Sequence, residues 1–188
     1  MSDVRPRPRR RRLVLGLGGA ALVVALIAAA TLLSDTAPST GAVEYTAVDQ
    51  ATGEPVDLAS LAGRPVLLTS WATWCGPCAE ELPAIQRLYE ERRGEGFEVV
   101  AVNVNAAGPD EPAIAPMAEE FGLTMPQWRD RDNDFAGVFD GVGVPTNVLV
   151  DADGAVVRTW QGAIDVEDED FLATLDEALA SSTGDGGA

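Results

Sequence analysis

The chain has 188 residues and a formal net charge of −17, with 46% hydrophobic and 23% charged residues. These values suit one globular domain with short appendages, and the acidity argues against nucleic acid as a partner. The chain contains neither histidine nor lysine, which excludes histidine general bases and lysine Schiff-base chemistry.

The N-terminal segment has the pattern of an exported, membrane-anchored protein. Residues 1–12 carry six arginines, and residues 13–33 form an apolar run without a charge. About 20 such residues span a bilayer, so we expect a transmembrane anchor (or uncleaved signal). The arginines predict a cytoplasmic basic segment and a body outside the cytoplasm. Two other interpretations remain, a signal cleaved near residues 28–30 and a twin-arginine signal at Arg10 and Arg11.

Two further segments have the composition of flexible chain. Residues 34–42 are small and polar and include Pro38 and Gly41, which predicts a linker. Residues 181–188 predict a flexible tail. The part between them, residues 43–180, shows no internal repeat and is expected to be a single domain.

The hydrophobic pattern of this domain predicts strands alternating with helices. We expect strands at 43–48, 66–71, 97–104, 147–150 and 155–160, and helices at 79–93, 111–122, 133–141 and 167–180. An Asp-Gly pair at 153–154 is the turn signal for a hairpin between the last two strands. The order predicts an α/β fold, a mixed sheet with helices on both faces.

The only cysteines, Cys75 and Cys78, stand two residues apart where a predicted strand gives way to a predicted helix. A disulfide across so short a loop would remove little unfolded-state entropy, which disfavours a structural staple. A zinc site needs about four ligands, and without histidine only carboxylates could complete it. We therefore expect no metal ion and no cofactor.

A redox couple explains the spacing and the position of the two cysteines better. Cys75 at a helix N-terminus would have its thiolate stabilised by free N–H groups and the helix dipole. Pro77 suits the first helical turn, and Cys78 would follow one turn later, shielded from solvent. An exposed nucleophile beside a buried resolving thiol is the arrangement that thiol–disulfide exchange needs.

These motifs resemble a known family. Residues 66–83, VLLTSWATWCGPCAEELP, with GVPT at 143–146, are similar to the TlpA/ResA-like membrane-anchored disulfide oxidoreductases of the thioredoxin superfamily. That group includes the cytochrome c biogenesis thioredoxins. CGPC alone occurs in many thioredoxins, but its combination with an N-terminal anchor is more specific. The resemblance covers about residues 43–180 and implies a thioredoxin-like fold.

The resemblance implies roles for individual residues. Cys75 would be the attacking thiol, Cys78 the resolving thiol, and Pro145 a cis-proline beside the disulfide. Val144 would offer its backbone to a substrate strand. The other expected substrate-binding residues are Trp74, Gly76, Pro77 and Thr146.

Glu81 matches an acidic residue that lies near the cysteine pair in this family. Thioredoxins proper carry an aspartate six residues before the first cysteine, and Thr69 occupies that position here. Glu81 is therefore the candidate for proton transfer to Cys78. The alternative is a plain acid in the first helical turn, worth about 0.3–1 kcal/mol, and on either view we expect Glu81→Gln to leave stability unchanged.

The resemblance implies an extracytoplasmic thiol–disulfide oxidoreductase acting on protein disulfides, with apocytochrome c as the family-like substrate. A Gly-Pro dipeptide between the cysteines favours the reducing direction. We expect a membrane electron-donor protein as a partner and a monomeric state. One alternative is a peroxiredoxin-like peroxidase, although Leu68 and Ala72 break the Pro-x-x-x-Thr-x-x-Cys pattern. The other is a tethered, non-catalytic thioredoxin-fold binding module.

Overall fold

The computed structural model describes residues 41–105 and 111–183. The predicted basic segment, the predicted anchor and nearly all of the predicted linker lie outside these residues, as does most of the predicted tail. Within the described part of the chain, no helix has the length and apolar character needed to cross a membrane.

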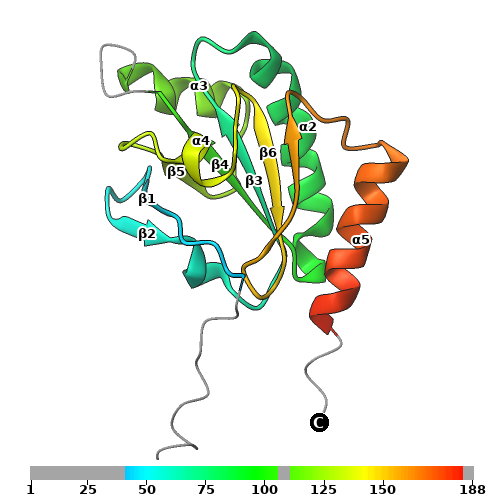
Figure 1. Ribbon diagram of the computed structural model, residues 1–188. Helices are drawn as coiled ribbons and strands as arrows, with labels where there is room; N and C mark the ends of the chain where they lie inside the picture. Colours follow the sequence, from blue (N-terminus) through cyan, green and yellow to red (C-terminus); the bar gives the residue numbers. More distant parts are fainter. Residues whose placement is uncertain (1–40, 106–110, 184–188) are drawn as a thin grey trace, which may run out of the picture. The chain divides into compact units, whose positions relative to one another are not determined.

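One mixed sheet of seven strands organises the domain (Figure 1). The strand order is β2-β1-β5-β4-β3-β6-β7. The strands are β1 (Thr46–Asp49), β2 (Pro55–Asp57), β3 (Val66–Trp71), β4 (Glu98–Asn103), β5 (Gln127–Arg129), β6 (Thr146–Val150) and β7 (Val156–Gln161). The central strand β3 pairs in parallel with β4 and antiparallel with β6. All six residues of β3 are buried, as its apolar sequence predicts.

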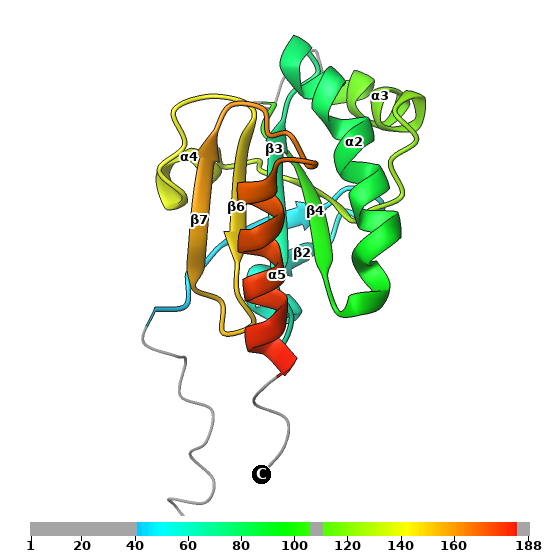
Figure 2. The same cartoon turned by 90° about the vertical axis from the view of Figure 1, so that its right-hand side faces the viewer.

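Helices cover the sheet, as predicted. They are α2 (Gly76–Arg92), α3 (Ile114–Glu120), α4 (Phe135–Val138) and α5 (Glu169–Thr183), with 3₁₀ turns η1 (Leu58–Leu61), η2 (Arg93–Glu95) and η3 (Glu111–Ala113). Figure 2 shows α2 and α5 over the same face of the sheet. Their apolar sides meet that face in one core cluster. The single turn of α4 and the turn η1 contribute to a second cluster on the opposite face.

The alternation of side chains along β3 determines which of them face helix α2. Leu67 and Trp71 belong to the cluster that contains α2. Val66 and Leu68 belong to the cluster on the opposite face. Because successive residues of a strand point to opposite faces, Thr69 lies on the α2 face together with Leu67 and Trp71.

Several element boundaries differ from the predicted ones. Strands β2 and β5 were not expected, because three residues are too few to show an alternating pattern. The predicted helix at 111–122 divides into η3 and α3, and the one at 133–141 is only one turn long. Helix α5 continues to Thr183, because no helix breaker precedes Gly184, so the predicted tail is partly helical.

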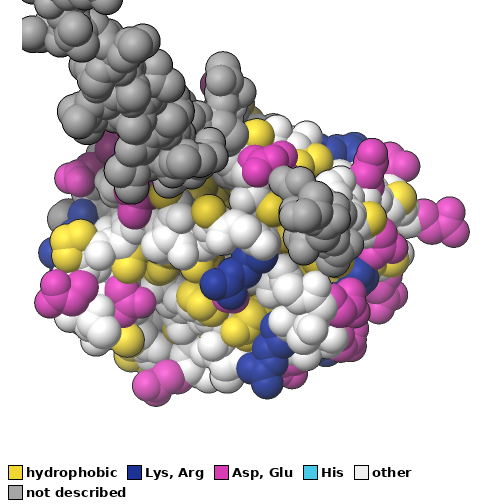
Figure 3. All heavy atoms as spheres, turned by 90° about the horizontal axis from the view of Figure 1, so that it is seen from below, with side chains coloured by type: hydrophobic (Ala, Val, Ile, Leu, Met, Phe, Trp, Pro, Cys, Tyr) yellow, Lys and Arg dark blue, Asp and Glu magenta, His cyan; other side chains and the backbone are white. Residues whose placement is uncertain are grey.

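The acidity of the chain is visible on the molecular surface. Figure 3 shows one face with acidic side chains scattered across it and arginine side chains in fewer, separate places. Ion pairs among the described residues involve five arginines: Arg64, Arg92, Arg129, Arg131 and Arg158.

Candidate active site

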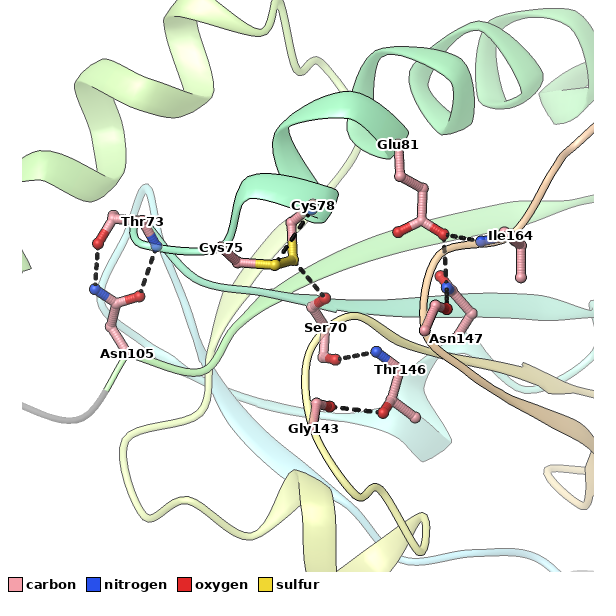
Figure 4. The surroundings of a disulfide bond; sticks show 11 residues. Ser70, Thr73, Cys75, Cys78, Glu81, Asn105, Gly143, Thr146, Asn147 and Ile164 are labelled. Carbon is pink, nitrogen blue, oxygen red and sulfur yellow. Dashed lines mark hydrogen bonds between the residues drawn. A yellow bond between two sulfur atoms is a disulfide. The ribbon is translucent and has the colours of Figure 1, made fainter.

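The two cysteines lie at the junction between β3 and α2, as predicted. Cys75 is the N-cap residue of α2, and its Sγ accepts a hydrogen bond from the Cys78 N–H at 3.2 Å. Pro77 lies in the first turn, where its missing N–H leaves no hydrogen bond unmade. A disulfide joins Cys75 to Cys78, with their Cα atoms 5.3 Å apart (Figure 4).

The two cysteine residues are both buried, to different degrees. Cys75 is 6% exposed and Cys78 is 1% exposed. The expectation of an exposed nucleophile is therefore wrong for the disulfide form, although Cys75 is the more accessible of the two. The reason is packing: both cysteines belong to the core cluster under α2, and Val144 packs against that cluster.

The loop before β6 lies beside the disulfide and contains the expected cis-proline bond, Val144–Pro145. Ser70 of β3 connects this loop to the cysteines. Its carbonyl oxygen is 4.0 Å from Cys78 Sγ, and its hydroxyl accepts the Thr146 N–H at 2.7 Å. Sequence reasoning missed Ser70, whose only signal was a polar residue within an apolar strand.

Four of the five expected substrate-binding residues lie where a partner can reach them. Trp74 is 65% exposed, Gly76 and Pro77 are exposed, and Val144 is half-buried. Within the described residues, neither the N–H nor the C=O of Val144 is in a hydrogen bond. Its backbone is therefore free to pair with an added strand.

The expectation that the Thr146 side chain meets a substrate is wrong. This residue has no exposed surface, and its Oγ1 donates to the Gly143 carbonyl at 2.8 Å. Thr146 is the first residue of β6, a strand buried along its whole length, so its side chain shapes the loop and does not meet solvent.

A hollow of about 260 Å³ lies between Trp74 and the loop before β6. Its lining includes Ser70, Trp74, Phe135, Val142, Gly143 and Val144. Two of these side chains, Trp74 and Val142, are exposed apolar groups at the surface. The hollow can accept an apolar side chain of a polypeptide whose cysteine lies at the disulfide.

Glu81 is buried in the second turn of α2, so the alternative of a plain acid in the first helical turn is wrong. It is 4% exposed, and its Oε1 accepts hydrogen bonds from the Ile164 N–H at 2.6 Å and from Asn147 Nδ2 at 2.7 Å. Burial raises the pKa of Glu81 to about 7, while the two hydrogen bonds act in the opposite direction. The contact with Ile164 comes from the segment between β7 and α5, which no local sequence pattern places against α2.

Asn105 holds the loop that precedes Cys75 in place. Sequence reasoning did not single out this residue. Its Oδ1 accepts the Thr73 N–H at 3.0 Å, and its Nδ2 donates to Thr73 Oγ1 at 2.8 Å. This amide therefore joins the segment just after β4 to the segment just after β3 (Figure 4). Among the described residues, no group of three or more cysteine or carboxylate side chains is placed to hold a metal ion.

A mixed sheet, a Cys-x-x-Cys disulfide at a helix N-terminus and a neighbouring cis-proline loop together define a thioredoxin-fold protein with a redox-type cysteine pair. The chain belongs to the Redoxin family, whose model matches residues 33–176.

Curated relatives share this part of the chain. Thiol-disulfide oxidoreductase ResA of Bacillus subtilis is 31% identical over 117 residues, which cover 62% of this chain and 64% of that protein. ResA of Geobacillus thermodenitrificans is 38% identical over 107 residues, covering 56% of this chain and 59% of that protein. The chain thus spans less than two thirds of the length of these relatives.

Solved structures confirm the thioredoxin-like fold. A putative thiol:disulfide interchange protein DsbE from Chlorobium tepidum superposes with a TM-score of 0.65 at 25% identity, covering 76% of this chain and 99% of its own. A thioredoxin family protein from Chlorobium tepidum TLS gives a TM-score of 0.62 at 26% identity, covering 78% and 99%.

Proposed function

We propose that the protein is an extracytoplasmic thiol–disulfide oxidoreductase that reduces disulfides of exported proteins. The observation that carries the proposal is the Cys75–Cys78 disulfide at the N-terminus of α2, beside the cis-proline loop. At a helix N-terminus the thiolate of Cys75 is favoured once the bond is reduced. The similarity to proteins named thiol-disulfide oxidoreductase supports the same reaction.

The reaction proceeds by two exchanges. The Cys75 thiolate attacks one sulfur of a substrate disulfide, and the other substrate sulfur leaves as a thiolate that takes a proton from solvent. Cys78 then loses its proton, attacks Cys75 Sγ and releases the first substrate sulfur as a thiolate. Two electrons pass to the substrate and the Cys75–Cys78 disulfide re-forms. A second dithiol protein must reduce it again, and we propose a membrane electron donor for this step.

The surface around the disulfide supports a polypeptide substrate. Val144 offers unpaired backbone groups for an extended strand, and the hollow beside Trp74 offers space for an apolar side chain. Apocytochrome c is the substrate that the family resemblance suggests. We further propose a monomer held in the membrane by residues 13–33, with its catalytic domain outside the cytoplasm.

The test uses the purified full chain in detergent. Wild-type protein should reduce insulin disulfides with dithiothreitol as the electron source, and Cys75→Ser should not. Cys78→Ser keeps the nucleophile but lacks the resolving thiol, so it should accumulate mixed disulfides with protein substrates on non-reducing gels. Wild-type protein without reductase activity would indicate a binding module, and equal trapping by both serine variants would show that the nucleophile is misassigned.

A further inference from the structure

The loop between α4 and β6 forms one wall of the hollow beside Trp74. Gly141, Val142, Gly143 and Val144 of this loop all line the hollow. The Val142 side chain is 86% exposed, and the backbone of Val144 is free to pair with an added strand. The shape of the loop therefore sets two of the contacts that a polypeptide can make beside the disulfide.

The backbone of this loop has a conformation that needs support. Asp140 has a φ of 55°, in the left-handed region that residues other than glycine rarely adopt. At Gly141 an added Cβ would lie 3.3 Å from Ala136 Cα and 3.3 Å from Thr146 Oγ1. Backbone strain of this kind persists only where surrounding contacts hold it.

The side chain of Gln161, the last residue of β7, supplies contacts of this kind. Its Oε1 accepts hydrogen bonds from the Val142 N–H at 3.0 Å and from Thr146 Oγ1 at 3.3 Å. Its Nε2 donates to the Asp140 carbonyl oxygen at 3.0 Å. Among the described residues, no other group bonds to the Val142 N–H or to the Asp140 carbonyl. One amide therefore joins three points of the loop.

The exposure of Gln161 makes these contacts informative. Gln161 lies at the surface, where water could satisfy its amide in any orientation. Its amide instead has both its carbonyl oxygen and its NH₂ group directed at the loop, and only this orientation matches every donor to an acceptor. The side chain therefore acts as a support for the loop.

The same contacts relate the loop to the cysteines. Gln161 is directly opposite Thr146 in the β6–β7 ladder. The Thr146 N–H donates to Ser70 Oγ, and the Ser70 carbonyl oxygen lies 4.0 Å from Cys78 Sγ. Figure 4 shows Thr146 joined to both Ser70 and Gly143. The hollow is thus held at a fixed position relative to the disulfide.

We propose that Gln161 is a positioning residue that makes the protein selective for polypeptide disulfides whose cysteines are flanked by apolar residues. This inference rests on the proposed function. A loop that is already ordered binds its partner without the cost of ordering it. Gln161 forms no hydrogen bond with either cysteine among the described contacts, so it affects docking of the polypeptide and not the exchange between sulfur atoms.

The experiment compares Gln161→Met with Thr159→Val in the full chain. Methionine has nearly the length of glutamine but forms none of the three hydrogen bonds. Thr159 precedes Gln161 by two residues on the same face of β7, and no hydrogen bond among the described residues joins its side chain to the loop. It is therefore the matched control.

The substrates are two disulfide-bonded peptides and hydroxyethyl disulfide, which is small and uncharged. One peptide has leucine on both sides of each cysteine, and the other has serine at the same positions. Wild-type protein, with dithiothreitol as the electron source, should prefer the leucine peptide. Gln161→Met should lower kcat/KM for this peptide about fivefold or more through a higher KM, with kcat unchanged. It should leave the other two substrates unaffected, and Thr159→Val should match the wild type.

The rate with hydroxyethyl disulfide shows whether the variant is folded and keeps a working cysteine pair. A Gln161→Met variant that retains the wild-type preference for the leucine peptide would overturn the proposal. So would an equal loss with all three substrates, since Gln161 would then act on the cysteine pair or on folding. Failure of the proposed function looks different, because wild-type protein would then reduce neither peptide and no insulin.

Discussion

Folding changes the pKa of the Glu81 carboxyl group, because it removes this group from water. In the unfolded chain it is solvated, and in the folded domain it keeps only the hydrogen bonds from Ile164 and Asn147 to one of its oxygens. Loss of solvation outweighs these two bonds, so the pKa of Glu81 rises to about 7. Near neutral pH the group is then present in both protonation states, which suits a residue that exchanges protons with a thiol.

The raised pKa predicts how stability depends on pH. In the unfolded chain Glu81 loses its proton above pH 4.5, whereas in the folded protein it loses the proton only around pH 7. The resulting contribution to the free energy of unfolding is fully present below pH 4.5, falls as the pH rises through about 7 and then levels off. The total decrease in the free energy of unfolding is roughly 3 kcal/mol. Glu81→Gln should lack this fall, as measured by urea unfolding at a series of pH values.

Glu80→Gln is the matched control, because Glu80 precedes Glu81 on α2 and is exposed. It should follow the wild-type curve. If the Glu81→Gln and wild-type curves stay parallel across this pH range, the carboxyl group is not perturbed by burial. This prediction replaces the sequence-based expectation that the Glu81→Gln substitution leaves stability unchanged.

At the scale of elements, the position of Cys75 depends on contacts between segments that are distant in sequence. The loop between β3 and α2 is held by Asn105, which follows β4, and by the Ser70–Thr146 contact with β6. Both contacts are at the ends of strands that pair with β3. The register of the sheet therefore determines where α2 begins and where its N-cap sulfur lies.

Removing the Asn105 side chain should loosen this junction. Asn105→Ala deletes two hydrogen bonds to Thr73 and leaves the Thr73 N–H without its acceptor, at a cost of about 1–3 kcal/mol. Amide hydrogen exchange should show lost protection at Thr73 together with a lower free energy of unfolding. Thr73→Ala removes only the hydroxyl partner and keeps the N–H bond, so residue 73 should stay protected in that variant. If hydrogen exchange at residue 73 is unchanged in Asn105→Ala, the Asn105 side chain does not hold the loop.

The elements that the sequence predicts well are those whose signal is local. The apolar runs of β3 and β4 and the spacing of Leu82, Ile85 and Leu88 in α2 each indicate one structure. Strand β5, Gln127–Arg129, has no such signal, since it is short and two of its three residues are polar. It forms because β1 and β4 supply hydrogen-bond partners on both sides.

The same distinction applies to the site. The positions of Cys75 and Cys78 follow from a strand end and a helix N-terminus, which are local features. The position of Pro145 was expected from the family resemblance. The burial of Glu81 depends on Asn147 and Ile164, which are 66 and 83 residues away in sequence. No pattern around Glu81 contains that information, so its place near the cysteine pair was expected from the family resemblance alone.

At the scale of the whole molecule, the charge of −17 favours cationic partners. Acidic side chains are scattered over the face shown in Figure 3, with arginines in fewer places. A field of one sign attracts oppositely charged molecules and accelerates their association at low salt.

Exchange with a basic polypeptide disulfide should therefore be faster at low ionic strength and slow by about tenfold or more as salt is added. An acidic polypeptide with the same cysteine spacing should show the opposite trend, and a small uncharged disulfide should show little change. Stopped-flow tryptophan fluorescence provides the rates. Equal salt dependence for the basic and acidic polypeptides would contradict electrostatic steering.

The proposed membrane orientation can be tested on the same scale. With arginines before the apolar run 13–33, the C-terminal body should face away from the cytoplasm and fractionate with membranes. A reporter that is active only outside the cytoplasm, fused after Ala188, should be active. A reporter that is active only inside should be silent, and the reverse result would contradict the proposed localisation.

The small exposure of the disulfide has a consequence for selectivity. With only 6% of Cys75 accessible and an exposed Trp74 next to it, free thiols in solution meet the bond rarely in a productive orientation. A polypeptide that pairs with Val144 instead presents its cysteine at a high effective concentration. We therefore expect the cysteine pair to exchange electrons faster with docked proteins than with small thiols in solution. If so, two groups of thiols with different reduction potentials would come to equilibrium only slowly in one compartment.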